Sequence, residues 1–141
     1  MQAAMTAFSA TSSAAELLDL VEAFDIEAAV QRFAPAGVLD LPNRGGGLPT
    51  ELVGHAEIRR FMRALPKLFA RLTFVDRHYH QTTTPTRAIV EYRGDGSTIA
   101  GRPYCNRYIA VFEFDESGAL VLWREYFDPL VIQEALAPDP A

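Results

Sequence analysis

The sequence offers few means of holding the chain by covalent bonds or of anchoring it in a membrane. Cys105 is the one cysteine among 141 residues, so an internal disulfide is excluded and folding needs no oxidising compartment. No apolar run approaches the roughly 20 residues of a membrane span, and no basic start followed by an apolar stretch opens the chain. We therefore expect a soluble, cytoplasmic protein with no membrane partner.

Positive charge is scarce. The chain has 13 lysines and arginines against 18 acidic residues, a formal charge of −5. A nucleic-acid backbone would be repelled unless the basic residues gathered on one face. The arginines between Arg59 and Arg77 form the one cluster, and they lie largely on a predicted helix, where a solvated face is the usual role. We predict no nucleic-acid partner.

Cofactor motifs are also missing. Three glycines, 45–47, lie in the stretch NRGGGLPTELVG, but neither a Gly-Lys-Ser/Thr sequence nor a helix start follows them directly. Because three consecutive glycines fit no regular element, we predict a flexible loop that forms a mobile flap. No motif for a metal, nucleotide or redox cofactor appears, and we predict that no cofactor is used.

The length and the 49% hydrophobic content are typical of one globular domain. We expect a flexible leader at 1–13, a single domain at 14–137 and a tail at 138–141. Helical periodicity predicts helices at 13–24, 26–33 and 55–66, the last ended or kinked at Pro66. A period of two predicts strands at 37–42, 72–81, 87–93, 102–115 and 119–128, with a helical turn or two after Pro129. This order indicates an α+β domain whose helices pack on one face of a curved, mostly antiparallel sheet.

The last predicted strand, LVLWREYFDP, carries one acid on an apolar face. Alternation places Glu125 with Trp123 and Phe127. Loss of hydration there would raise the pKa of Glu125, and a carboxyl group poised near neutrality can take up and return a proton. We therefore expect Glu125 to be catalytic. The alternatives are an outward-facing side chain or a structural ion pair with Arg124 or Arg93.

The preceding strand supplies possible partners on one face. Asn106 and Tyr108 would orient a substrate carbonyl and stabilise developing negative charge. An apolar pocket with a few polar groups is typical of small-molecule sites, although the tyrosines would serve equally as core residues. The aromatic residues expected to shape this pocket are Trp123, Phe127, Tyr104 and Phe112.

Other polar residues have competing interpretations. His78 and His80 alternate with Asp76, a pattern that permits metal binding or a pocket proton carrier, but an exposed edge strand explains it equally well and no third ligand has a fixed spacing. Asp40 should point away from the pocket unless a bulge reverses it.

Three further residues are expected to play structural roles. Glu91 is expected to form an ion-pair ladder with Arg87 and Arg93 on the same strand face, and the alternative is an acidic group that faces the pocket. His55 is expected to cap a helix, and Cys105 to pack as a small side chain.

Several stretches resemble the NTF2-like superfamily, which includes ketosteroid isomerase, SnoaL-like polyketide cyclases and the PhzA/PhzB phenazine-biosynthesis proteins. They are RFAPAGVLDLP (32–42), GHAEIRRF (54–61), PYCNRYIAVFEFDESGAL (103–120) and REYFDP (124–129). The resemblance implies a cone-shaped α+β fold. It also implies pairing through the outer sheet face, for which this chain offers Ile109, Val111, Leu120, Leu122 and Tyr126.

When the catalytic positions of these families are matched to this sequence, one acidic residue remains. The ketosteroid isomerase base, tyrosine and second aspartate fall on Leu41, Leu17 and Ala110, which excludes that mechanism. The acid of SnoaL-like cyclases and of the phenazine proteins falls on Glu125, whereas the phenazine histidine falls on Phe61. The resemblance thus places Leu17, Leu41 and Phe61 around a substrate, and we include His78 among the candidate substrate contacts.

Two functions remain open from the sequence. The first is a cofactor-independent enzyme that binds an apolar, cyclic carbonyl compound and performs an isomerisation, cyclisation or condensation with Glu125 as proton carrier. The second is a non-catalytic ligand-binding or dimerisation module of the same fold.

Overall fold

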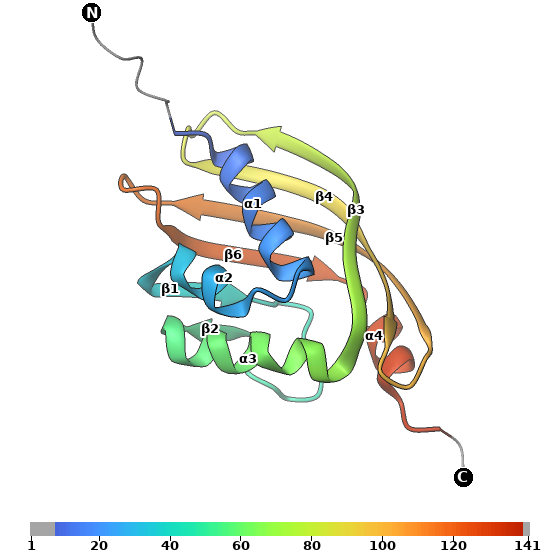
Figure 1. Ribbon diagram of the computed structural model, residues 1–141. Coiled ribbons are helices and arrows are strands. Elements are labelled where there is room, and N and C mark those ends of the chain that lie inside the picture. Colours follow the sequence, from blue (N-terminus) through green and yellow to red (C-terminus); the bar gives the residue numbers. More distant parts are fainter. Residues whose placement is uncertain (1–7, 140–141) are drawn as a thin grey trace, which may run out of the picture.

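The computed structural model describes residues 8–139, which form four helices and six strands (Figure 1). In chain order they are α1 (Ala10–Glu22), α2 (Ile26–Arg32), β1 (Phe33–Asp40), β2 (Glu51–Val53), α3 (Gly54–Leu68), β3 (Phe69–Gln81), β4 (Arg87–Thr98), β5 (Pro103–Phe114), β6 (Leu120–Phe127) and α4 (Pro129–Leu136). Figure 1 shows α1, α2 and α3 over one face of the sheet, and α4 at the end where β6 finishes.

The six strands form one curved sheet that is not closed. Their order is β2-β1-β6-β5-β4-β3, and every neighbouring pair is antiparallel except β1 with β6. β3 bends strongly at a bulge between Val75 and His78, where Asp76 has a φ of 51° (Figure 1). The predicted α+β class, with helices on one face of a mostly antiparallel sheet, is confirmed.

α1 begins earlier than the sequence suggested. The Ser9 hydroxyl accepts a hydrogen bond from the Ser12 N–H at 3.2 Å and caps the helix. Ala10 and Ala14 are fully buried, because their small side chains let this end of α1 approach the sheet closely. Residues 10–13 of the predicted leader are therefore helical, whereas 1–7 lie outside the described residues.

Other element boundaries also differ from the sequence-based predictions, among them those of β1, which runs 33–40 where 37–42 was expected. Residues 51–53, expected in a loop, form β2 because their backbone pairs with β1 through Val38 and Val53. α3 continues through Pro66 to Leu68, so Pro66 does not end the helix as the sequence suggested. The final helix is capped by Asp128, whose side chain accepts from the Leu130 N–H at 3.0 Å, and the predicted tail positions 140–141 are not described.

An arginine clamp holds α1 over the bend of β3. The Arg77 Nε donates to the Phe74 carbonyl at 2.8 Å, and its guanidinium pairs with Asp19 at 2.7 Å and with Glu22 at 3.3 Å. Glu22 also accepts from the Phe74 N–H at 2.8 Å. These bonds fix the distance between α1 and the sheet, and with it one wall of the space beneath the helices.

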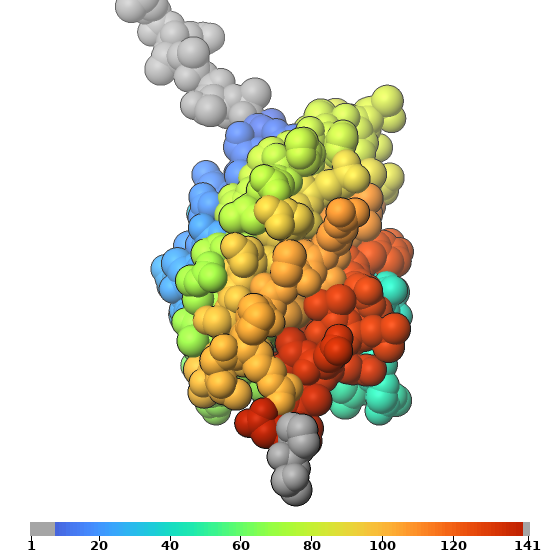
Figure 2. Space-filling view, turned by 90° about the vertical axis from the view of Figure 1, so that its right-hand side faces the viewer, coloured from blue at the N-terminus to red at the C-terminus, as the bar shows by residue number. Residues whose placement is uncertain are grey.

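The outer face of the sheet is partly apolar, and Figure 2 views the molecule onto β4, β5 and β6. Ile109 and Tyr126 are 41% and 39% exposed, but Leu120, expected on this face, is fully buried. The β5–β6 register shifts between Glu113 and Phe114, and this irregularity takes Leu120 out of the alternation. Dimerisation through this face stays a prediction. Within residues 8–139, each helix is too short or too polar to cross a membrane.

Candidate active site

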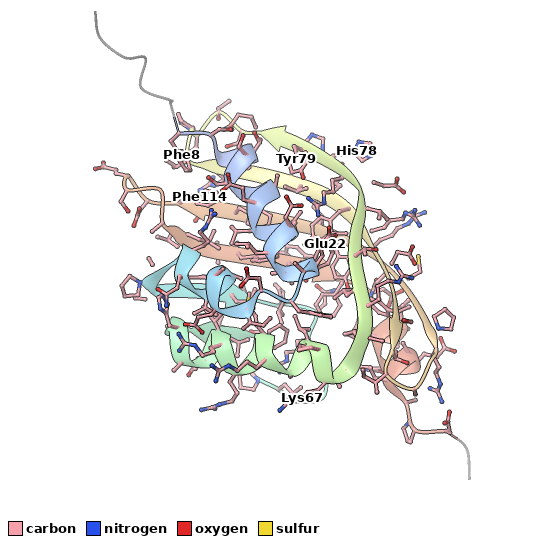
Figure 3. All side chains as sticks on the ribbon, viewed as in Figure 1. Phe8, Glu22, Lys67, His78, Tyr79 and Phe114 are labelled. Atoms are coloured by element: carbon pink, nitrogen blue, oxygen red, sulfur yellow. The ribbon has the colours of Figure 1, made fainter. Side chains whose placement is uncertain are left out.

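A cavity of about 470 Å³ opens between the sheet and the helices. Its walls come from the inner faces of β5 and β6, from α3, from the loop after β1 and from α4. Most of the lining is apolar, and Figure 3 shows the side chains that fill the space between the helices and the sheet. The sequence-predicted site residues that line it are Leu41, Phe61, Tyr108, Trp123, Glu125 and Phe127.

Glu125 is the acidic group of this cavity within the described part of the chain. It lies on β6 between Trp123 and Phe127, and the Tyr92 hydroxyl donates a hydrogen bond to its Oε2. Burial raises the pKa of Glu125 to about 7, and the hydrogen bond from Tyr92 and the nearby Trp123 indole oppose that rise. At pH 7, Glu125 is therefore ionised in about half of the protein molecules.

Neither arginine that the sequence offered as a structural partner neutralises this acid. Arg124 Nε donates to Asp40 Oδ2 at 2.8 Å, and Arg93 Nε donates to Asp76 Oδ2 at 2.7 Å. Asp40 pairs with Arg124 across the parallel β1–β6 register, away from the cavity, as strict alternation predicts. The Glu125 carboxylate thus keeps a tyrosine as its partner instead of a cation.

Tyr92 is a site residue that the sequence reasoning missed. It lies on β4 and reaches Glu125 of β6 across the intervening strand, because the residue directly opposite Glu125 on β5 is Ala110. A larger side chain at Ala110 would fill the path of the phenol. The Tyr92 ring stacks on Tyr108 with centroids 5.2 Å apart. In the stretch IVEY (89–92), alternation puts Tyr92 on the opposite face of the strand from the exposed Glu91. That inward orientation was the signal for Tyr92 available in the sequence.

Tyr108 lines the cavity and belongs to a separate chain of polar contacts that runs through Tyr104 to Asn106. Its hydroxyl contacts that of Tyr104, which in turn accepts from the Asn106 side-chain amide at 2.9 Å. The Tyr108 ring has room because Gly94 faces it on β4, where an added Cβ would lie 2.6 Å from the ring. Burial raises the pKa of Tyr108 far above its ordinary value, so its hydroxyl keeps its proton.

Asn106 fills a different role from the one expected. Its side-chain amide donates to the Asp128 carbonyl at 3.0 Å, and its oxygen accepts from the backbone N–H of Asp128 at 3.1 Å and of Arg107 at 2.8 Å. Asn106 is 2% exposed and is not part of the cavity lining. These bonds tie β5 to the corner between β6 and α4, so the amide is held by backbone.

Four other expected contacts lie behind or outside the cavity wall. Leu17 is fully buried in the core beneath α1. The Phe112 ring packs on the Trp123 ring with centroids 4.9 Å apart, and the Tyr104 ring packs on the Phe69 ring with centroids 5.0 Å apart. Phe112 and Tyr104 therefore support the lining residues Trp123 and Phe69 from behind. His78 lines a depression on the outer face, and Figure 3 shows it on the other side of β3 from α1.

The remaining polar candidates are engaged elsewhere. His80 pairs with Glu91 at 2.9 Å on the exposed part of β3 and β4. The His55 ring hydrogen-bonds the Phe33 carbonyl at 2.8 Å instead of capping α3. Cys105, expected to pack, is exposed beside Arg93. Within residues 8–139, no three His, Cys, Asp or Glu side chains are grouped to hold a metal ion.

The glycine loop contributes part of the cavity lining. Gly45, Gly46 and Leu48 line it opposite Gln133 of α4, and the Arg44 guanidinium lies over the Phe61 ring at 5.4 Å. Arg44 also donates to the Pro49 carbonyl at 3.0 Å, which closes the loop on itself. The predicted flap therefore lies against the cavity, and its mobility stays a prediction.

Replacing Tyr92 by phenylalanine should raise the pKa of Glu125 above 7. The variant removes the hydrogen bond that favours the carboxylate while leaving burial unchanged, and one such bond corresponds to about one pKa unit. The carboxyl ¹³C resonance of Glu125, assigned by its loss in Glu125→Gln, follows the titration. Tyr126→Phe, an exposed tyrosine on β6, is the matched control. An unchanged or lower midpoint would contradict a positioning role for Tyr92.

Comparisons with known proteins agree with this architecture. The family profile of the SnoaL-like domain matches residues 14–123. An uncharacterized PhzA/B-like protein of Pseudomonas aeruginosa is 33% identical over 120 residues, which cover 84% of each chain. An uncharacterized Bacillus subtilis protein is 31% identical over 99 residues, covering 70% of this chain and 67% of its own.

Solved structures show the same fold. A Bacillus subtilis protein provisionally described as an isomerase superposes with a TM-score of 0.81 and 26% identity, over 89% of this chain and 91% of its own. A Pseudomonas putida protein provisionally described as a polyketide cyclase gives a TM-score of 0.79 at 20% identity, over 93% of this chain and all of its own. A phenazine biosynthesis-related protein of Pseudomonas aeruginosa gives 0.75 at 20%, over all of this chain and 91% of its own.

Proposed function

Because this chain belongs to the SnoaL-like family, we propose that it is a cofactor-independent acid/base enzyme acting on an apolar, cyclic carbonyl compound. Glu125 is the group that moves the proton. The descriptions of the structural neighbours as a polyketide cyclase and an isomerase support this class of reaction.

The observation that carries the proposal is the state of Glu125. An acid beside an apolar cavity, with a pKa of about 7 and a neutral tyrosine as its partner, can act as base and as acid at the same pH. A structural carboxylate would instead be paired with a cation, as Asp40 is with Arg124. The cavity of about 470 Å³ falls within the roughly 300–1,000 Å³ of small-molecule sites.

The chemistry follows from these groups. The Glu125 carboxylate removes a proton from carbon next to a carbonyl, and the resulting acid returns it to another carbon or to an oxygen. Return at a new position gives isomerisation, whereas attack of the enolate carbon on a second carbonyl gives cyclisation or condensation. Leu41, Phe61 and Phe127 exclude water from the apolar part of the substrate.

Hydrogen exchange at carbon tests the proposal without the natural substrate. The protein should accelerate deuterium uptake at the α-carbons of 2-tetralone in D₂O, measured by proton NMR against buffer alone. The enzyme-dependent rate should rise through pH 7, because the base is the carboxylate and its fraction increases with pH through the Glu125 pKa. Binding of 2-tetralone without any exchange above the buffer rate would favour the rival function, a non-catalytic ligand-binding module.

A further inference from the structure

The cavity wall contains one buried donor that is not satisfied. Trp123 is 3% exposed and lines the cavity. Its Nε1–H is the buried side-chain polar atom without a hydrogen-bond partner within residues 8–139. Buried donors are nearly always paired in folded proteins, so an unpaired one on a residue that lines a cavity points to an acceptor that arrives from outside the chain.

The other polar groups at this end of the cavity already have partners. The Tyr92 hydroxyl donates to Glu125, the Tyr108 hydroxyl contacts that of Tyr104, and the Asn106 amide is held by backbone. The donors that the sequence suggested for a substrate carbonyl are thus engaged within the protein. The indole N–H is the buried side-chain donor for which the described residues supply no acceptor.

We propose that the Trp123 Nε1–H is the hydrogen-bond donor to the substrate carbonyl oxygen and sets the requirement for an oxygen acceptor at the inner end of the ligand. The inference rests on the proposed function and deepens it by naming the donor that holds the substrate carbonyl inward beside Glu125. The hydrogen bond itself does not depend on turnover, so it can be tested separately.

In the reaction, the indole stabilises the charge that proton transfer creates. Glu125 takes the proton from the α-carbon, and the C–H electron pair becomes the new carbon–carbon double bond. The carbonyl π pair moves onto the oxygen, and the Trp123 N–H stabilises this enolate. The proton returns from Glu125 when the enolate collapses, so the cycle needs no other reactant.

The competing interpretation is that the Trp123 indole stabilises the Glu125 carboxylate and not a substrate. Trp123 lies near enough to the carboxylate and to Tyr92 to lower the pKa of each, although its N–H meets neither with hydrogen-bonding geometry in the described structure. If the indole shifts to bond Glu125 permanently, it cannot act on the substrate. The experiment must therefore separate an acceptor on the ligand from an acceptor on the protein.

Trp123 is the single tryptophan of the chain, so a ¹⁵N-labelled sample has one indole N–H resonance. The probes are 2-acetylnaphthalene and 2-ethylnaphthalene, which differ in the carbonyl oxygen. We expect the indole proton to move downfield when the ketone binds and not when the hydrocarbon binds. The ketone should also bind about fivefold more tightly than the hydrocarbon, and Trp123→Phe should abolish this preference.

Phe112→Leu is the matched control, because it disturbs packing on the Trp123 ring but keeps the donor. It should retain the preference for the ketone. The NMR measurement uses the unaltered protein and does not depend on whether Trp123→Phe folds.

Three results would overturn the inference. One is an indole resonance that follows the ionisation of Glu125 and ignores the ketone. Another is an equal response to both probes, and the last is binding of neither probe at the limit of solubility. Loss of 2-tetralone exchange with a persisting indole response would reject the enzyme function and keep the donor role, so the two failures are distinguishable.

Discussion

Replacing Glu125 by glutamine is expected to slow enzyme-dependent deuterium uptake by 2-tetralone about 100-fold to 10,000-fold, the usual contribution of a general base. The glutamine side chain has nearly the same shape and its oxygen can still accept from Tyr92, so the cavity should be preserved. What it lacks is a carboxylate oxygen basic enough to take up a proton at neutral pH. The rate is measured by proton NMR in D₂O at pH 8, where most of the carboxyl groups of the unaltered protein are ionised.

Two controls separate catalysis from folding in this comparison. Glu91→Gln changes an exposed glutamate on β4 that pairs with His80, and it should leave the exchange rate unchanged. Affinity of Glu125→Gln for 2-ethylnaphthalene should also be unchanged, because the hydrocarbon tests the apolar cavity alone. Full exchange activity in Glu125→Gln would reject Glu125 as the proton carrier.

The same substitution should change how stability depends on pH. The pKa of Glu125 is about 7 in the folded chain and 4.5 for an exposed glutamate, a difference that corresponds to about 3 kcal/mol. Because the folded pKa is the higher one, the folded state binds more protons between these values. The free energy of unfolding therefore falls as pH rises from about 4.5 to 7, and the loss is complete above pH 8.

Urea denaturation at pH 5 and pH 9 measures this effect. Other groups titrate as well, so the informative quantity is the difference between the unaltered protein and Glu125→Gln at each pH. The glutamine variant should gain about 2.5 kcal/mol on the unaltered protein between pH 5 and pH 9, because part of the loss has already occurred at pH 5. A difference that does not vary with pH would mean that Glu125 is hydrated and that burial does not raise its pKa.

Together the two results connect stability with activity. A carboxyl group held in apolar surroundings destabilises the fold at the pH where it works as a base. Glu125→Gln should therefore give a more stable and inactive protein at pH 8. A structural ion pair predicts the opposite, because removing one partner would lower stability.

Much of the architecture was predictable from local pattern. The switch from helical spacing to a period of two separates the helices from the long strands, because periodicity reflects which face of an element is buried. Alternation in LVLWREYFDP likewise placed Glu125 with Trp123 and Phe127, and all three line the cavity. These features depend on neighbours in the sequence, so the sequence alone determines them.

What the tertiary structure decided depends on register and on chain corners. Tyr92 reaches Glu125 because the strands bring Ala110 directly opposite that acid, and Asn106 is engaged because the corner at Asp128 lies beside it. The unpaired indole N–H of Trp123 can be recognised only once the hydrogen-bond partners of the described residues are known from the structure. Pairing between distant segments sets these contacts, and alternation within one strand carries no information about it.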